Sequence, residues 1–514
     1  MLHQIPFLRL LLFFIAGIIV QWRMNLPLAG ICIPVGVAIV CLVLSFVPAV
    51  RRPYRFRFLF GTGLCCLLFA SAVGMTKMSQ KQSDWDMPAE SYRYQAIIID
   101  EPVDKPKTRM CKIRITAAEA SIHSAVAGKE AVIYLPKDSL SRTLVAGDGL
   151  RFYGTLESAA PYLKKQSVAA SGFVRANRWA VYSGSASPFS IRLKALAVRR
   201  ALLQRLQQIV PDPSACSIAA ALMFGYRNEV DDALMQSFRN IGAAHILAIS
   251  GTHFVILFGM CYFLLSLIIN NSRKGKRLKQ GILLPLAWAF AFLTGFSPSV
   301  VRAVLMLTVW GIGEMLAYRA FTLNTVAATA FLMLWFHPLY LFDVGFQLSF
   351  MAVISIVLLN PYLMAGYESR NPALNYLWGL ICVSISAQAG VTPLSAFYFH
   401  QIPVLFLLAN ICLLPLASVL LGLIPVSLLL HALFGGIPGL LYPLNRALAV
   451  FISMVRHLDD FSYINIQNVS MNEWDTVVFS LAILLLILLW IKKRGIYLCL
   501  LLLLMVFQVM YRFV

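Results

Sequence analysis

Long apolar runs fill both ends of the chain, and a stretch of short alternating segments separates them. A run of about 20 apolar residues can cross the hydrocarbon core of a bilayer as a helix. The pattern predicts a polytopic α-helical membrane protein with about 11–13 spans. The predicted spans cover roughly residues 6–22, 27–49, 57–75, 243–269, 281–296, 299–317, 321–337, 341–359, 375–398, 403–433, 437–458, 475–491 and 495–513. The run 403–433 is too long for a straight span, so Pro415 and Pro425 predict a broken helix there.

Residues 92–188 follow a different pattern, in which apolar and polar positions alternate with a period of two. This alternation is typical of β-strands that bury one face. About five or six short strands, separated by Pro, Gly and charged turn residues, predict a small all-β domain inserted between the membrane segments. That number of strands fits a barrel of the OB-like type.

An amphipathic helix is predicted at 190–209, with apolar side chains towards one side and Arg192, Arg199 and Arg205 towards another. A second amphipathic segment follows Pro211. Such helices either lie flat in the membrane interface, which we favour, or guide a phosphate backbone. The predicted divisions are an N-terminal membrane part (1–76), the β domain (92–188), amphipathic interfacial helices (190–240) and a second membrane part (241–514).

Composition supports a membrane protein. Hydrophobic residues make up 60% of the chain and charged residues 13%, with a mean hydropathy of +0.77. Soluble domains are about 45–50% apolar and about 25% charged. The first apolar run lacks a cleavage site of small residues, so we expect it to be retained as a span.

The net charge of +21 partly reflects the excess of Lys and Arg in cytoplasmic loops of membrane proteins. If the basic stretch 51–57 is cytoplasmic, the N-terminus lies inside and the β domain lies outside the cytoplasmic membrane. The same count of spans places the basic loop 270–280 and residues Lys492, Lys493 and Arg494 inside. The remaining positive charge suits a polyanion or an anionic lipid surface.

Ten cysteines lie mostly in apolar runs, and the β domain contains only Cys111. An internal disulfide is therefore not expected in that domain. No CxxC motif or Cys/His spacing suggests a metal site, and we expect no metal and no cofactor.

The β domain carries 14 Lys and Arg against 8 Asp and Glu, a net charge of +6. Aromatic residues beside cations suit single-stranded nucleic acid, because its bases stack on aromatic rings and its phosphates pair with cations. Composition alone favours the other interpretation, an ordinary soluble barrel with basic turns and core aromatics. The candidate DNA-binding residues are Arg151, Tyr153, Lys164, Lys165, Phe173, Arg175, Arg178 and Trp179.

Residues 220–259 contain a partly charged segment that leads directly into an apolar one, which still carries the run AHILAISGTHF. Imidazoles and a Ser-Gly step are costly in hydrocarbon unless they face protein or water. This run closely resembles the signature of the competence-type (ComEC-type) DNA-uptake channels of bacterial membranes. Thr252 and Phe254 stand where aliphatic residues are more usual. The residues singled out are Arg227, Asp231, His245, Ser250, Gly251 and His253.

Two further segments resemble the same family. FHPLYLFDVGFQLSFMAV (336–353) is similar to a family run of Asp-x-Gly-Phe-Gln-Leu-Ser-Phe, although His337 stands where the family often has Asp. Residues 388–417 are similar to a pattern that ends in Ala-Asn-x-x-x-x-Pro, and their prolines are expected to break helices. A Pro-Ser-hydrophobic-Arg-Ala pattern also matches before 304. The candidate residues are Arg302, Asp343, Gln347, Ser349 and Asn410, with Glu314 or Asp343 as partners for Arg302.

The resemblance implies an inner-membrane channel that passes single-stranded DNA into the bacterial cytoplasm during natural transformation, with an OB-like domain outside. Many family members end in a metallo-β-lactamase-like domain whose HxHxDH motif does not occur here, so the chain resembles a short form. The implied partners are lipid, a periplasmic DNA receptor, a separate nuclease and a cytoplasmic helicase-like motor.

Two other functions stay open. An ion-coupled transporter would use Arg302, Asp343 and Glu314 in a relay. A serine intramembrane peptidase would pair Ser250 with His253, three residues apart on a helix. Since AISG lacks the first Gly of GxSG, and no Walker A, HExxH or paired catalytic carboxylates occur, we expect no enzyme activity.

Overall fold

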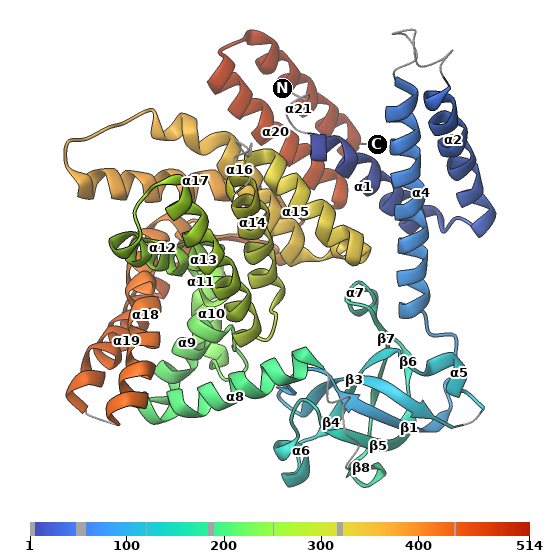
Figure 1. Cartoon of the computed structure of the whole chain (residues 1–514), viewed down its shortest axis with the longest axis horizontal. Helices are drawn as coiled ribbons and strands as arrows, with labels where there is room; N and C mark the ends of the chain where they lie inside the picture. Colours follow the sequence, from blue (N-terminus) through green and yellow to red (C-terminus); the bar gives the residue numbers. More distant parts are fainter. Residues whose placement is uncertain are drawn as a thin grey trace. The chain divides into compact units, whose positions relative to one another are not determined.

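The computed structural model describes residues 6–47, 58–119, 121–182, 190–249, 251–315, 322–435 and 438–513. The chain forms two compact units, each assembled from separate stretches of sequence (Figure 1). The first unit comprises Met1–Arg200 and Leu305–Asp343, and the second comprises Ala201–Val304 and Val344–Val514. Ser250 and the basic stretch 51–57 lie outside the described residues.

The first unit contains a group of packed helices. These are α1 (Pro6–Met24), α2 (Leu28–Phe46), α4 (Phe58–Ser83), α15 (Thr322–Phe336) and the 3-10 turn η4 (Pro338–Phe342). Helix α4 packs against α1 and α2, and α1 also packs against α15. Gly17 permits the close approach of α1 to α4, since a Cβ there would lie 2.6 Å from the Phe69 carbonyl oxygen. The three predicted N-terminal spans are thus helices, each long and apolar enough to cross a membrane.

The same unit holds the predicted β domain. Its elements are β1 (Ser91–Ile98), β2 (Val103–Asp104), β3 (Thr108–Ala118), β4 (Glu130–Pro136), β5 (Gly149–Thr155), β6 (Glu157–Ser158), β7 (Val168–Phe173) and β8 (Trp179–Tyr182), with short helices α5 (His123–Val126), α6 (Ser139–Thr143), α7 (Pro161–Lys164) and the 3-10 turn η3 (Ala176–Arg178). The strand order is β6-β7-β4-β3-β1-β5-β8, and β4 and β7 run parallel. Because β6 follows β5 after the single residue Leu156 and pairs with β7, the sheet curls back on itself.

Alternation along the strands builds the core of this domain. Cys111, Ile113 and Ile115 of β3 are fully buried, and the residues between them are not. The period-two pattern therefore predicted the inward faces correctly. Burial raises the pKa of the Cys111 thiol to about 12, so this cysteine is a core residue rather than a reactive one.

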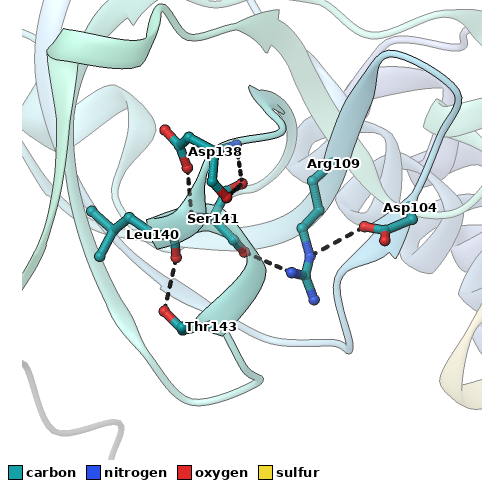
Figure 2. A network of polar contacts seen from close by, with 6 residues as sticks. All are labelled: Asp104, Arg109, Asp138, Leu140, Ser141 and Thr143. Carbon is teal, nitrogen blue, oxygen red and sulfur yellow. Dashed lines mark hydrogen bonds and ion pairs between the residues drawn. The ribbon is translucent and has the colours of Figure 1, made fainter.

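A polar network fixes α6 against β3 (Figure 2). The Arg109 guanidinium donates a hydrogen bond to the Ser141 carbonyl oxygen at 2.7 Å and lies 3.5 Å from the Asp104 carboxylate. Asp138 caps α6 by accepting a hydrogen bond from the Ser141 amide. Arg109 is thus held by the protein itself, and its charge is directed into the structure.

The β domain is tied to the helices that enter and leave it. Trp85, just after α4, packs in the β core and donates its Nε1 hydrogen to the Leu156 carbonyl oxygen at 3.1 Å. On leaving, helix α8 (Ile191–Ile209) forms an Arg192–Asp100 ion pair at 2.9 Å and an Arg200–Glu101 ion pair at 3.1 Å. Both ends of the domain are therefore anchored.

Helix α8 confirms the predicted helix at 190–209, but its faces differ from the prediction. Arg199, expected on the polar side, is only 8% exposed, whereas Ile191 is 64% exposed. The buried stripe runs through Leu196, Arg199 and Leu206, which lie three or seven residues apart on one side of a helix. The long aliphatic stem of an arginine packs well in such a stripe.

The second unit is helical. It contains α9 (Pro213–Phe224), α10 (Asp232–Asn240), α11 (Ala244–Leu247), α12 (Gly251–Ile268), α13 (Arg273–Leu293), the first part of α14 (Pro298–Met315), α16 (Val344–Met364), α17 (Pro372–Phe399), α18 (Phe406–Phe434), α19 (Pro438–Asp459), α20 (Glu473–Lys492) and α21 (Gly495–Phe513). Short strands β9 (Gln401–Ile402) and β10 (Ile466–Gln467) pair with each other. Helix α9 is buried along nearly its whole length.

Two details of the span prediction were wrong. The segment 403–433 is not a broken helix, because α18 continues through Pro415 and Pro425, and α17 likewise continues through Pro393. A proline removes one hydrogen bond, and neighbouring helices in a bundle make that loss tolerable. The segment 243–269 is instead interrupted between α11 and α12. Within the described ranges, eight helices are long and apolar enough to cross a membrane, and four shorter apolar helices accompany them.

Candidate functional site

Two glycines with left-handed backbone shape the 220–259 segment. Gly225 ends α9 with φ 67°, and a Cβ there would lie 3.3 Å from the Ile249 side chain. Gly242 follows α10 with φ 72°, and a Cβ there would lie 2.7 Å from Pro403. A residue with a side chain is strained at such angles, and at position 242 its Cβ would also collide with Pro403. Glycine at 242 therefore allows the chain just before the AHILAIS run to pass close to Pro403 and to Phe406 at the start of α18.

A chain of polar groups connects this run to α17 and α18. The exposed His245 ring lies 3.1 Å from the Gly242 carbonyl oxygen and next to the Asn410 amide. Asn410 is buried on α18, and its Nδ2 donates to the Ser384 hydroxyl of α17 at 3.2 Å. His253, 1% exposed on α12, lies close enough to His245 to interact with it electrostatically. The polar chain thus runs from an exposed imidazole into the interior of the second unit.

Residues 344–353 of the 336–353 segment lie on α16, which packs against α17 in the same unit. The Tyr398 hydroxyl of α17 donates to the Gln347 side-chain oxygen of α16 at 2.8 Å. Close packing accompanies this bond, since a Cβ on Gly390 would lie 2.7 Å from the Met351 carbonyl oxygen. Ser349 is half-buried on α16. Helix α17 therefore contacts α16 directly and is linked to the 220–259 segment through Asn410 of α18, and the residues that make these contacts all belong to the second unit.

The other predicted residues occupy different positions. Arg302 is 8% exposed on α14 within the second unit, whereas Glu314 and Asp343 belong to the first unit, so their pairing with Arg302 stays a prediction. Arg227 is exposed in the connection between α9 and α10, and Asp231 directly precedes α10. The exposed Gly251 begins α12.

Sequence reasoning missed Ser384 and Tyr398, the two partners on α17. Ser384 and Ser386 interrupt an apolar run, and both are buried, at 4% and 0% exposure. That interruption was a visible signal. The sequence contains no signal for the position of Tyr398 beside Gln347, because that position depends on how α16 and α17 pack.

On the β domain, cations and aromatic rings gather on the outward face of β1, β5 and β8. Arg151 and Tyr153 of β5 are exposed, as the period-two pattern predicts. The Arg178 guanidinium lies 5.2 Å from the Tyr153 ring centre, and Arg151 lies 4.7 Å from the Tyr182 ring centre. Arg93 of β1, exposed and directly across from Tyr153, was not predicted. We refer to Arg93, Arg151, Tyr153, Arg178 and Tyr182 as the aromatic–basic face.

The remaining DNA-binding candidates divide into three groups according to their exposure. Phe173, at 55% exposure, and Arg175 are exposed, while Lys164 and Lys165 are half-buried at the end of α7. Trp179 was predicted to bind DNA, but it is only 8% exposed and belongs to the domain core, where it lies across from Phe152. Its place on β8 alternates with outward residues, so it faces inward and does not present a stacking surface.

The outward side of β3 and β4 is electrostatically different. Glu130 pairs with Lys112 at 2.9 Å and with Arg114 at 2.7 Å. Burial by itself would raise the pKa of Glu130, but the charges and hydrogen bonds of Lys112 and Arg114 outweigh that effect and hold the pKa below its ordinary value. These two cations therefore share one carboxylate partner.

Comparison with known proteins decides the family. The family model described as Competence protein matches residues 222–493, more than half of the chain. This chain belongs to the competence protein family. The matched residues contain most of the 220–259 segment and all of the 336–353 and 388–417 segments, and the β domain precedes them. With its long apolar helices, the chain is a multi-pass membrane member of this family, as the resemblance predicted.

Three relatives illustrate the range of similarity. ComE operon protein 3 of Bacillus subtilis is 31% identical over 229 residues, which are 44% of this chain and 28% of that protein. Recombination protein 2 of Haemophilus influenzae is 25% identical over 293 residues, 54% of this chain and 35% of that protein. An uncharacterized protein of Aquifex aeolicus is 28% identical over 279 residues, covering 62% of its length. The chain thus spans less than two thirds of each of these relatives. No solved structure matches the chain.

Proposed function

We propose that this competence-family membrane protein conducts single-stranded DNA through the bacterial inner membrane into the cytoplasm during natural transformation. The observation that carries the proposal is the meeting of three sequence motifs through polar side chains inside a helical unit. His245, Asn410 and Ser384 form one branch, and Gln347 and Tyr398 form the other. A strand of phosphates crosses a bilayer at tolerable cost only along a polar, hydrated lining.

Buried polar groups in this unit favour such a lining. The Ser386 hydroxyl on α17 and the Ser297 hydroxyl beside α14 are buried without a hydrogen-bond partner in the described part of the chain. Buried groups of this kind are usually satisfied by water. Together with His245 at the surface, they support a hydrated interior for this unit.

We assign to the β domain the binding of the incoming strand on the outer side of the membrane. In this arrangement the N-terminus of the protein lies inside. Its curled sheet, with a parallel β4–β7 pair and β5–β6 returning to β7, supports an OB-like barrel. The aromatic–basic face offers stacking rings beside cations, which suits single-stranded DNA. A periplasmic DNA receptor, a separate nuclease and a helicase-like motor complete the proposed system.

Deletion of the gene, followed by measurement of labelled DNA entering the cytoplasm, tests the proposal. Uptake should fall to background. Unchanged uptake contradicts the proposal and leaves an ion-coupled transporter to be tested by substrate-dependent ion flux.

A narrower test is Arg302→Ala in the intact protein. Because Arg302 is a buried cation in the second unit, we expect DNA uptake to fall at least about tenfold while the amount of protein in the membrane is unchanged. Arg446→Ala, at an exposed position on α19, is the matched control and should have no effect on uptake. Loss of the Arg302→Ala protein from the membrane would instead assign Arg302 a structural role.

A further inference from the structure

The turn between α12 and α13 is held by its own side chains. Ser272 caps α13 by accepting a hydrogen bond from the Gly275 amide at 3.1 Å, and its hydroxyl donates to the Asn270 side chain at 2.6 Å. Gly275 is required here, because a Cβ would collide with the Asn270 carbonyl group. The turn therefore has one defined shape rather than many.

A buried lysine braces the same turn. Lys279 is 0% exposed, and its ammonium donates to the Ser266 hydroxyl at 2.9 Å and to the Asn271 side-chain oxygen at 2.7 Å. The ammonium also lies 5.0 Å from the Tyr262 ring centre. These partners are neutral, so the positive charge of Lys279 adds to the potential of the turn instead of being cancelled by a carboxylate at this site.

Four further cations project from this braced turn. Arg273, Lys274, Lys276 and Arg277 are all exposed in the first turn and a half of α13. We refer to these four residues as the basic tip. No acidic residue occurs in the sequence between Ala233 and Gly313, so the helices α11, α12 and α13 carry no carboxylate. The basic tip is therefore a cluster of exposed positive charge on a turn of defined shape.

The surface that leads to the basic tip is apolar. Phe263, Leu264 and Leu267 of α12 are 63%, 58% and 68% exposed, and their spacing places them on one side of the helix. Ile268, the last residue of α12, is 86% exposed. An apolar stripe that ends in clustered cations matches the two parts of a phospholipid, with acyl chains along the stripe and a charged headgroup at the tip.

We propose that the basic tip binds the phosphate headgroup of an anionic phospholipid, with the acyl chains against the exposed side of α12. A DNA strand also carries phosphates, but it has no acyl chains that would pack against the apolar stripe beside the basic tip. The lipid is therefore the occupant favoured by the structure. The proposal does not depend on DNA conduction, only on the protein being in a membrane.

Native mass spectrometry of the full-length protein tests this. Purified protein is titrated with phosphatidylglycerol or phosphatidylcholine in detergent, and the ratio of the two bound lipids is measured. The variant R273Q/K274Q/K276Q/R277Q should reduce the preference for phosphatidylglycerol by about tenfold or more, since each basic residue near a headgroup contributes. The control K105Q/K107Q/K137Q/R142Q removes four exposed charges from the β domain and should keep the preference.

A milder variant guards against a folding defect. K274Q/K276Q retains both arginines and should show an intermediate loss of preference, with an unchanged thermal unfolding midpoint. An unchanged lipid preference in the quadruple variant overturns the proposal. If that variant instead loses binding of a fluorescent single-stranded oligonucleotide while its lipid preference persists, the basic tip is a nucleic-acid surface and the proposal is wrong.

Discussion

The β domain and the second helical unit place their polar groups in opposite ways. In the β domain, Ile113 and Ile133 are fully buried, and charged side chains such as Arg114 and Glu130 pair on the outside. In the second unit, Ser386 is fully buried and Asn410 nearly so, whereas Leu267 of α12 is 68% exposed. The first arrangement suits water, and the second suits lipid on the outside with a polar interior.

This difference shows where the position of a polar residue indicates function. On the β domain, a polar surface is expected whatever the function, so only the gathering of aromatic rings with cations is informative. Inside the helical unit, each buried polar group costs free energy unless it is satisfied. A cluster of them therefore requires an explanation, and passage of a charged substrate provides one.

Breaking the polar interior should have the largest effect. Asn410→Leu removes the donor to Ser384 and the polar neighbour of His245, at a cost of about 1–3 kcal/mol for the unpaired buried groups. We expect DNA uptake to fall at least about tenfold, because an apolar side chain would dewet the route. The measurement is uptake of labelled DNA by cells with matched amounts of protein in the membrane.

Ser418→Ala on the same helix is the control for this variant. Its hydroxyl donates to the Leu414 carbonyl oxygen of its own helix at 2.7 Å and bridges to no other helix in the described contacts. Uptake should be unaffected. Equal losses in both variants would show that α18 tolerates no change at all, and the polar branch would lose its special role.

A smaller effect is expected on the β domain, where Tyr153→Ala removes one stacking ring from the aromatic–basic face. Stacking of one base contributes about 1–3 kcal/mol, so the affinity of the full-length protein for a labelled oligothymidine should fall about tenfold. Tyr162→Ala is the matched control, since Tyr162 is 60% exposed on α7, away from that face. Fluorescence anisotropy at fixed salt measures both. If Tyr162→Ala weakens binding as much as Tyr153→Ala, the interface has been placed on the wrong face.

The comparison also shows how far the sequence alone was informative. Hydropathy predicted the eight helices of the described residues that are long and apolar enough to cross a membrane, and alternation predicted the β strands, because strand alternation reflects burial of one face. The motif run around His245 identified the family. What the sequence did not reveal depends on contacts between distant segments: Arg93 lies across from Tyr153 only once β1 pairs with β5.

The inward turn of Trp179 and the continuity of α18 have the same origin. Trp179 reads as a stacking residue beside Arg178, but strand alternation directs it into the core. Taken from the sequence alone, Pro415 and Pro425 predict a break in the helix. Packing in the bundle overrides that tendency. The net charge also does not show where the charge is accessible, since Lys112 and Arg114 are both paired with Glu130.

The ion pairs of Glu130 with Lys112 and Arg114 support the smallest predicted effect. The pKa of Glu130 in the folded protein lies below its ordinary value of 4.5, so the ionised carboxylate stabilises the fold above about pH 4.5. This stabilisation is lost as the pH falls through the folded-state pKa, when the carboxylate takes up a proton. Glu130→Gln removes it at every pH, at a cost of less than about 1 kcal/mol near pH 7.

The thermal unfolding midpoint of the β domain within the full-length protein, followed from pH 7 to about pH 3, measures this effect. The difference between wild type and Glu130→Gln should be largest near neutral pH and should shrink below about pH 4.5 as the wild-type carboxylate is protonated. Glu157→Gln, at an exposed position on β6, controls for the removal of one negative charge. A difference that stays constant over the whole pH range would mean that Glu130 acts through packing and not through its charge. In that case Lys112 and Arg114 would be available to a phosphate backbone, and the two faces of the β domain would differ less than their ion pairs indicate.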